Sequence, residues 1–258
     1  MVSVKELLNL EGQVSVITGG ATGIGFQMAN GLAEAGSNIV LCSRKVEVCE
    51  DACGKLEKLG VKTLAVACDV TKSDQVEAMK EAVMKKFARV DMLMNNAGRA
   101  WVAPPEDMPL DRWQQVMDLN INAALICSQA IGREFIKQKH GKIINIASIA
   151  GLVGRNPAAY SSIAYSTSKG ALVHFTRDLA VKWAQYNIQV NCIAPGFFVT
   201  PLNVKLFEKN RDYLEAEVPS HRTGGPDDLK GAAVLLASQA SNHITGVILP
   251  VDGGTIAW

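Results

Sequence analysis

The sequence predicts an α/β fold, a doubly wound domain built around a seven-stranded parallel sheet. Two observations carry this prediction: short apolar runs alternate with helical patterns along the chain, and a glycine-rich turn follows the first apolar run. Apolar strands joined by helices are typical of a parallel sheet that is covered on both faces. With 258 residues, 48% of them hydrophobic, the chain is long enough to bury a core without a metal or disulfide.

Each of the first six expected strands is followed by a helix. The first helix ends at residue 35 because Gly36 supplies a stop, and the second, over residues 46–59, ends at Gly60. Ser73 is expected to cap the third helix, which runs to residue 87. Two longer helical regions cover residues 110–139 and 165–185, and residues 225–228 predict the start of the last helix. The expected strands are residues 14–18, 38–42, 63–67, 91–94, 142–146, 189–193 and 246–250.

No internal repeat, low-complexity tract or linker interrupts this pattern, so we assign residues 1–258 to one domain. The least regular segment spans about residues 197–225. Ligands of such sheets lie at the carboxyl ends of the strands, and this segment leaves such an end. It is therefore a candidate substrate lid, although an ordinary surface excursion accounts for it equally well.

Charge and apolar patterning exclude several classes of function. Lysine and arginine number 26 against 25 acidic residues, and the net charge of +1 argues against a nucleic-acid partner. No apolar run reaches the ~18 residues of a membrane span, and the first residues lack the apolar block of a signal peptide. The six cysteines are scattered in apolar segments. We interpret them as reduced core residues of a cytoplasmic protein and predict no metal site.

The glycine-rich turn at residues 18–25 lies directly between a strand and a helix. Its glycines allow backbone N–H groups to approach a pyrophosphate, and the helix N-terminus adds partial positive charge. A purely structural turn is the alternative, but the position near the N-terminus favours a Rossmann-type dinucleotide site. The residues expected to contact the cofactor here are Gly19, Thr22, Gly23, Ile24 and Gly25.

The residues after the second strand favour NADP(H) over NAD(H). An NAD site would place an acid about 20 residues after the glycines, whereas this chain has Ser43 and Arg44 there. The guanidinium can grip a 2′-phosphate. Thr22 is not basic and adds no second phosphate contact, so NAD(H) stays possible. Asp69 ends the third strand beside Val70, and it can accept a hydrogen bond from the adenine amino group.

Tyr165 and Lys169 stand four residues apart, on one face of a helix. Shifting a phenol pKa from ~10 towards ~7 requires about 4 kcal/mol. One ammonium at about 4 Å supplies that much at an effective dielectric of 20, so the pair is sufficient for a proton donor. Ser148 ends the fifth strand, where its hydroxyl can hydrogen-bond a substrate carbonyl, although it could equally be a turn serine.

From Gly12 to the C-terminus, the sequence resembles the short-chain dehydrogenase/reductase family. The family's marks stand in order, and their ordered set is far more specific than any one of them. They are residues 18–25, Asp69, the Asn-Asn-Ala-Gly turn at 95–98, Asn120, Ser148, Tyr165 with Lys169, Pro195-Gly196 with Thr200, and residues 250–254.

The resemblance implies a role for each matched residue. Tyr165 would be the general acid in reduction and the base in oxidation, Lys169 would lower the pKa of Tyr165 and hold the nicotinamide ribose, and Ser148 would orient the substrate oxygen. Asn120 would order a water that links Lys169 to solvent, with Asn122 as the rival for that role. Contacts to the cofactor are implied for Asn96, Ala97 and Gly98 at the adenosine ribose, and for Pro195, Gly196 and Thr200 at the nicotinamide. A homotetramer is also implied, with residues 110–139 and 165–185 at one interface.

The substrate stays open between two classes. The pattern is similar to reductases of 3-oxoacyl thioesters and to dehydrogenases of sugar acids such as gluconate, and residues 197–225 mix apolar with cationic side chains. The segment between Ser148 and Tyr165 is longer than the family usually shows, so Arg155, Asn156 or Tyr160 could contact substrate or only close a loop. A non-catalytic NADP(H)-binding sensor or scaffold is the alternative function, although it would have no chemical need for the complete catalytic set.

Overall fold

The computed structural model describes residues 1–154, 162–200 and 204–257. Its centre is a parallel sheet in the order β3-β2-β1-β4-β5-β6-β7, which confirms the predicted seven-stranded α/β fold. The chain starts in the middle of the sheet, builds outward to β3, and then returns past β1 to add β4. The strands are β1 (Val14–Thr18), β2 (Asn38–Ser43), β3 (Thr63–Ala67), β4 (Met92–Asn95), β5 (Gly141–Ile146), β6 (Ile188–Pro195) and β7 (Ile248–Val251).

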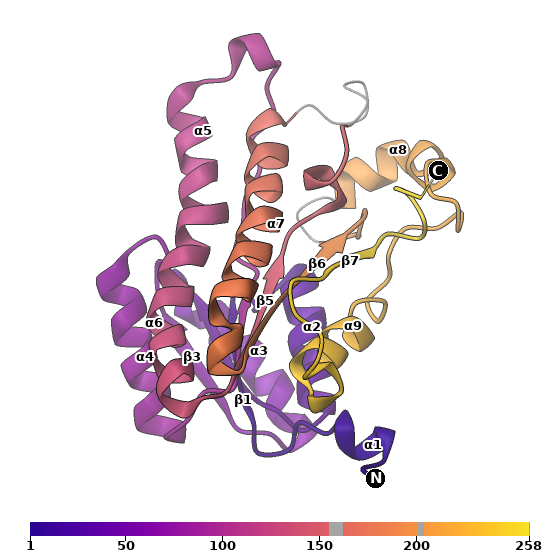
Figure 1. Cartoon of the computed structure of the whole chain (residues 1–258). Coiled ribbons are helices and arrows are strands. Elements are labelled where there is room, and N and C mark those ends of the chain that lie inside the picture. Colours follow the sequence, from indigo (N-terminus) through magenta and orange to yellow (C-terminus); the bar gives the residue numbers. More distant parts are fainter. Residues whose placement is uncertain (155–161, 201–203, 258) are drawn as a thin grey trace.

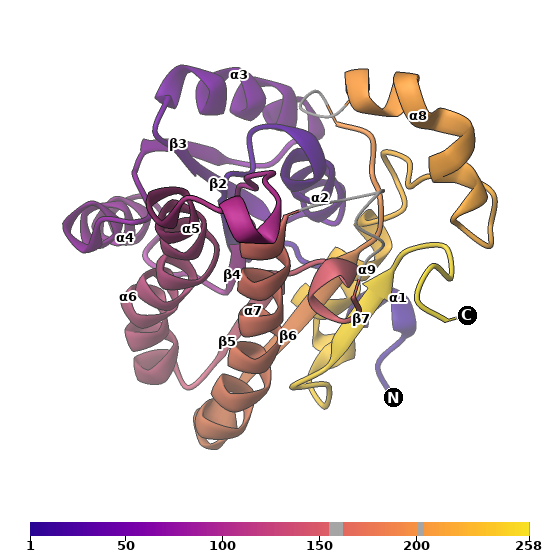
Figure 2. The ribbon, with the colours of Figure 1, turned by 90° about the horizontal axis from the view of Figure 1, so that it is seen from above.

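Helices cover both faces of the sheet (Figures 1 and 2). One buried cluster joins α2, α3 and α9 to one face, and a second joins α4, α6 and α7 to the other. Within β1, Val16 belongs to the second cluster and Ile17 to the first, because successive side chains point to opposite faces. The helices are α1 (Val4–Leu7), α2 (Gly23–Glu34), α3 (Val46–Leu56), α4 (Ser73–Phe87), α5 (Leu110–Met117), α6 (Ala123–Gln138), α7 (Ile163–Trp183), α8 (Val204–Ala216) and α9 (Lys230–Ala237).

Two expected helix starts are wrong. Ser73 is the first residue of α4 rather than its cap, and Lys72 takes the cap position without a side-chain hydrogen bond. α9 begins at Lys230 instead of at residues 225–228. There the Asp228 carboxylate accepts hydrogen bonds from Gly225 N and from Arg222, and these bonds hold the segment in a turn before the helix.

The region expected as one helix over residues 110–139 is interrupted. α5 and α6 are joined by a π-helical turn, Asp118–Asn122, which places Asn120 inside the protein. All six cysteines are free and buried. Among the described residues, no helix is both long enough and apolar enough to span a membrane.

Candidate active site

The glycine-rich turn connects β1 to α2 at the carboxyl edge of the sheet. Gly19 and Gly23 have φ angles of +62° and +55°, a region that side chains other than glycine seldom adopt. A Cβ atom at Gly25 would lie 2.7 Å from the Gly19 carbonyl oxygen, so only glycine lets the helix start this close to the turn. The backbone is therefore shaped for a group that contacts it directly.

The first turn of α2 leaves its N–H groups available. Thr22 occupies the cap position, but its side chain makes no capping hydrogen bond, and the Thr22 carbonyl accepts the bond from Phe26 N. The N–H groups of the residues between them, including Ile24, have no partner further back in the helix. This arrangement fits the pyrophosphate of a dinucleotide.

Asn96 braces the turn from the neighbouring strand. Its amide donates to the carbonyl oxygens of Thr18 and Gly19, each at 2.9 Å. The Thr18 hydroxyl in return accepts hydrogen bonds from the N–H groups of Asn96 and Ala97 at 3.0 Å. The structure thus gives the Asn96 side chain a positioning role in the turn itself.

Arg44 follows β2 and lies beside this turn, because the Cys42 carbonyl accepts a hydrogen bond from Gly19 N. The side chain of Arg44 is exposed, and its charge helps to lower the pKa of Asp69. The larger cause is a hydrogen bond from the Thr71 hydroxyl to the Asp69 carboxylate. Arg44 and Asp69 therefore lie near each other at the edge where β2 and β3 end.

The Ser43 hydroxyl, in contrast, is turned towards its own backbone and donates to the Lys45 carbonyl at 2.6 Å. Val70 is 5% exposed and lines a small cavity of about 10 Å³ together with Ala97 and Asn120. These residues join the end of β3 to the end of β4.

Ser148 and Tyr165 meet through their side chains. Ser148 follows β5, and its hydroxyl accepts a hydrogen bond from Ala150 N. A further hydrogen bond joins the Ser148 and Tyr165 side chains and lowers the pKa of the tyrosine. Burial is the larger influence, so the pKa of Tyr165 lies above its usual value.

Lys169 is one helical turn after Tyr165 and is 4% exposed. Its ammonium lies 5.6 Å from the centroid of the Tyr165 ring and donates to the Ile146 carbonyl at 2.6 Å. Burial lowers the pKa of Lys169 to about 8. The Lys169 ammonium thus lies beside the Tyr165 ring. It is held by β5, the strand that ends next to Ser148.

Asn120 is 2% exposed and ties two segments together. Its amide oxygen accepts from Arg99 N, and its amide nitrogen donates to the Arg99 carbonyl and to the Ser168 hydroxyl, all at 2.8–2.9 Å. A Cβ atom at Gly98 would lie 3.3 Å from Asn120 Oδ1 and 3.5 Å from Lys169 Nζ. Asn122, the rival, is exposed and donates to Asp118.

The end of β6 borders the glycine turn from the other side. Gly196 packs against Asp252, because a Cβ atom there would lie 2.9 Å from the Asp252 Cα atom. The Thr200 methyl group lies 3.4 Å from the position of a Cβ atom at Gly23. Pro195 is the last residue of β6 and is fully within the buried strand. Arg155, Asn156 and Tyr160, the candidate contacts of the long loop, lie outside the described residues.

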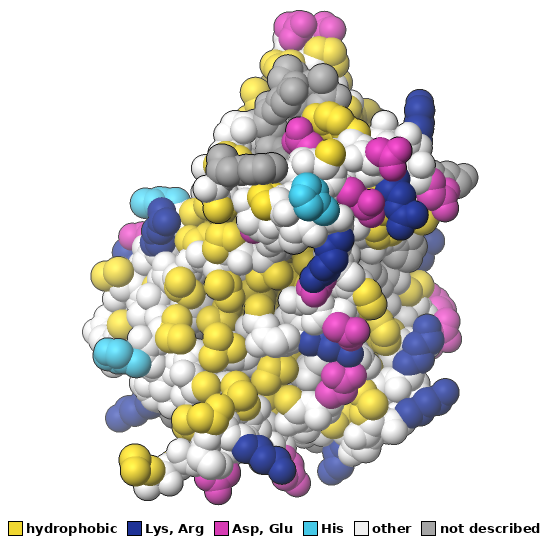
Figure 3. Space-filling view, turned by 90° about the vertical axis from the view of Figure 1, so that its right-hand side faces the viewer, with side chains coloured by type: hydrophobic (Ala, Val, Ile, Leu, Met, Phe, Trp, Pro, Cys, Tyr) yellow, Lys and Arg dark blue, Asp and Glu magenta, His cyan; other side chains and the backbone are white. Residues whose placement is uncertain are grey.

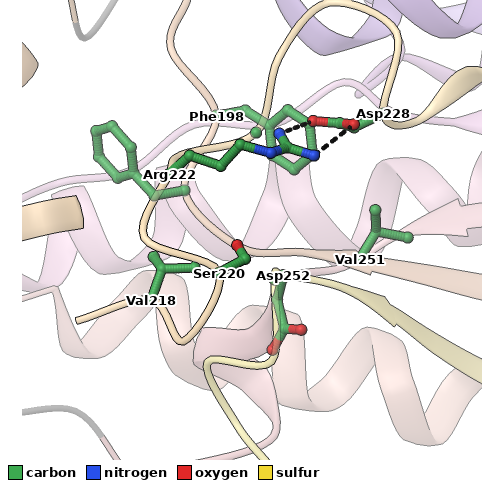
Figure 4. A pocket seen from close by; sticks show the side chains of 10 residues that line it. Phe198, Val218, Ser220, Arg222, Asp228, Val251 and Asp252 are labelled. Carbon is green, nitrogen blue, oxygen red and sulfur yellow. Dashed lines mark hydrogen bonds and ion pairs between the residues drawn. The ribbon is translucent and has the colours of Figure 1, made fainter. Parts of the chain in front are cut away.

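A cavity of about 110 Å³ lies next to the segment 197–225 (Figure 4). Arg222 reaches Asp228, and the two form an ion pair at 2.5 and 3.0 Å. Ser220 and Asp252 lie on the other side of this cavity. None of Ser148, Tyr165 and Lys169 lines this cavity.

Several residues that organise this site carried no sequence signal of their own. Ser162 donates to the Trp101 carbonyl at 2.6 Å, and thereby fixes the segment that leads into Tyr165. Ser168 accepts from Asn120 and donates to the Tyr165 carbonyl. Both are ordinary helix-start or helix-interior serines in the sequence, and only their distant partners distinguish them.

Comparison with known proteins agrees with this geometry. The family described as short chain dehydrogenase matches residues 13–211. The 5-keto-D-gluconate 5-reductase of Escherichia coli (strain K12) is 38% identical over 253 residues, which cover 97% of this chain and 98% of that protein.

Two solved structures are similar over nearly the whole chain. A gluconate 5-dehydrogenase from Burkholderia cenocepacia J2315, in complex with NADP and tartrate, has a TM-score of 0.93 and 35% identity. A short-chain type dehydrogenase/reductase from Mycobacterium marinum has a TM-score of 0.95 and 34% identity. Each comparison covers 99% of this chain and 100% of the other. With the match to the family itself, these similarities show that the chain belongs to the short-chain dehydrogenase family.

Proposed function

We propose that the protein is an NADP(H)-dependent oxidoreductase that interconverts a secondary alcohol and a ketone of a sugar acid by direct hydride transfer. The observation that carries this proposal is the hydrogen bond between Ser148 and Tyr165 beside the buried ammonium of Lys169. A hydroxyl pair of this kind can hold a carbonyl oxygen and deliver a proton to it.

The residues fit a dinucleotide at the carboxyl edge of the sheet. The turn from Gly19 to Gly25 would hold the pyrophosphate, Asp69 and Val70 the adenine, and Ala97 and Gly98 the adenosine ribose. Pro195, Gly196 and Thr200 would border the nicotinamide, and Lys169 would hold its ribose. When bound, the nicotinamide supplies or accepts the hydride. Arg44 favours NADP(H), in agreement with the NADP bound to the similar gluconate 5-dehydrogenase.

In the direction of reduction, Ser148 orients the substrate oxygen and Tyr165 donates the proton. Lys169 is protonated at pH 7, since its pKa is about 8. An ammonium about 4 Å from the phenol oxygen would be close enough to act on its charge. There it stabilises the phenolate by about 4 kcal/mol at an effective dielectric of 20 and offsets the effect of burial on the pKa of Tyr165. Asn120 would order a water that links Lys169 to solvent, so that Lys169 can return a proton to the phenolate and regain one from that water.

Sugar acids are the substrate class that we favour, because similar proteins act on gluconate or on 5-keto-D-gluconate by name. A 3-oxoacyl thioester is the second class, supported by the apolar side chains of segment 197–225. A binder without turnover is the less favoured function, because the catalytic set is complete and Tyr165 lies beside both Ser148 and Lys169.

We further propose that the chain forms one domain with segment 197–225 as the lid of the site. Within the described part of this segment, the ring of Phe207 on α8 stacks on the ring of Phe197, with centroids 6.2 Å apart. Gly224 N donates to the Phe197 carbonyl at 2.9 Å, so the two ends of the segment are tied together. A closed base of this kind lets the helix between them move as a unit.

A homotetramer in the cytoplasm is the assembly that we propose. Leu110 and Val181, on α5 and α7, are 78% and 79% exposed, which suits the interface expected on these helices. Figure 3 shows hydrophobic side chains gathered on the face that carries α9 and β7. Val247, directly before β7, is an exposed hydrophobic residue. Light scattering at micromolar concentration would give the mass of a tetramer, and a monomer mass would contradict the proposal.

The experiment that tests the proposed function is Tyr165→Phe. We expect kcat to fall by about 10²–10⁴, the usual contribution of a general acid, while the Kd for NADPH stays close to that of the parent protein. The assay would compare 5-keto-D-gluconate with a 3-oxoacyl thioester, each with NADPH and NADH. Undiminished turnover by the variant would show that Tyr165 is not the proton donor.

A further inference from the structure

A pair of arginines, one after β4 and one on α5, converges on one neutral oxygen. Arg99 Nη1 donates to Gln115 Oε1 at 3.1 Å, and Arg112 Nη1 donates to the same oxygen at 3.3 Å. We refer to Arg99 and Arg112, which share Gln115 as their acceptor, as the arginine pair. Two guanidinium groups that share one acceptor repel each other, so the arrangement favours an additional anion.

The positive charge of the arginine pair is only partly neutralised by nearby carboxylates. Arg112 Nε lies 3.4 Å from the carboxylate of Asp111, whose side chain is 66% exposed. In the described part of the chain, no carboxylate lies within ion-pair distance of Arg99. The pair therefore carries one more positive than negative charge, which matches a ligand with one carboxylate.

The pair is connected to the catalytic residues on two sides. Asn120 holds both backbone polar groups of Arg99 and also contacts Ser168, next to Lys169. Arg112 stacks on Trp101, with 4.4 Å between the guanidinium carbon and the ring centroid. The Trp101 carbonyl accepts from Ser162, three residues before Tyr165. The backbone of the pair is thus fixed relative to the proton donor.

We propose that the arginine pair binds the carboxylate of the substrate and selects sugar acids over neutral polyols. This inference rests on the proposed function, since it assumes that the reacting carbonyl lies at Tyr165. A planar guanidinium binds a carboxylate through two parallel hydrogen bonds, a geometry that a hydroxymethyl group cannot reproduce. In a 5-ketoaldonate the carboxyl carbon is four bonds from the carbonyl carbon, a span of about 5 Å.

The sharpest test is Gln115→Glu, which replaces the shared amide oxygen by a carboxylate of nearly the same shape. D-Gluconate and D-glucitol are matched substrates, because they differ only in a carboxylate against a hydroxymethyl group. We expect the ratio of their kcat/KM values with NADP⁺ to fall about 10- to 100-fold, the value of a lost charge-assisted hydrogen bond. Arg99→Met should lower the same ratio, and Arg133→Met, on the exposed side of α6, should not.

Three outcomes would overturn the proposal. The first is an equal loss on both substrates, which would indicate a general structural role. The second is an unchanged ratio in both Gln115→Glu and Arg99→Met. The third is a weakened Kd for NADPH that accounts for the whole loss, which would place the pair at a cofactor phosphate.

A binding experiment separates this proposal from the proposed function. Should the parent protein oxidise neither substrate, calorimetry would measure D-gluconate binding to the NADPH-loaded protein. Binding that weakens at least tenfold in Gln115→Glu supports the arginine pair even if sugar acids are not turned over. The proposal is contradicted if D-gluconate does not bind to the parent protein. It is also contradicted if D-gluconate binds equally well to the parent protein and to Gln115→Glu.

Discussion

At the scale of single residues, we propose that the side chain after Ser43 determines the choice of cofactor. Arg44 is exposed, stands next to the glycine turn, and shares its edge of the sheet with Asp69. A guanidinium in this place can bind a 2′-phosphate, whereas an acid would bind the hydroxyls of the unphosphorylated ribose.

Arg44→Asp should therefore weaken NADPH binding about 10- to 100-fold, the range of a charge-assisted hydrogen bond together with new repulsion. NADH has no phosphate at this position, so its Kd should change much less. Fluorescence titration with both cofactors measures the two constants. Equal changes would remove Arg44 from the phosphate site. Lys45→Asp, one residue further on, is the matched control for a general effect of charge.

The residues expected in the site could be identified from their spacing in the sequence, but their hydrogen-bond partners could not. Any two residues that are four apart in a helix share a face, so the sequence alone places Tyr165 beside Lys169. That Lys169 donates to the Ile146 carbonyl depends on where β5 ends relative to α7, a distance of 23 residues in sequence. The upward shift in the pKa of Tyr165 likewise follows from burial, which is a tertiary property.

At the scale of elements, the strands were predictable to within one or two residues, and the join between α5 and α6 was not. The apolar pattern of residues 110–139 is helical throughout, and one extra residue in a π turn barely changes it. That extra residue decides the outcome for two asparagines, since Asn120 turns inward to Arg99 and Ser168 while Asn122 faces solvent. Family resemblance, rather than periodicity, identified Asn120.

The late start of α9 has a similar origin. Residues 225–228 have the composition of a helix start, with a proline and two acids. The Asp228 carboxylate instead accepts hydrogen bonds from Arg222 and from Gly225 N. Arg222 is brought to Asp228 by the fold of segment 197–225, which the composition of residues 225–228 does not reveal. A side chain with two possible roles cannot be assigned from composition alone.

At the scale of the whole molecule, the carboxyl ends and the amino ends of the strands carry different kinds of polar residues. The carboxyl edge collects the candidate site, while the amino edge contains a buried lysine with no part in it. Lys142, in β5, is 2% exposed and donates to Ser241 Oγ at 3.1 Å and to Asn242 Oδ1 at 2.9 Å. Burial lowers its pKa to about 8.

This lysine makes the stability of the fold depend on pH. The unfolded lysine has a pKa of about 10.4, so between pH 8 and 10.4 the unfolded state binds more protons than the folded state. The cost of burying the charge is fully present below pH 8 and disappears as the pH rises through this window. Its size is about 3 kcal/mol, from a pKa difference of more than two units.

Lys142→Met removes the buried charge and so isolates this contribution from that of Lys169. We expect the difference in the free energy of unfolding between the variant and the parent protein to favour the variant most at pH 7. It should then shift towards the parent protein by about 3 kcal/mol by pH 10. Urea denaturation at several pH values measures both curves. Lys137→Met, at an exposed position of α6, is the control for the loss of a surface lysine. A pH-independent difference for Lys142→Met would mean that Lys142 is neutral, or equally charged, in both states.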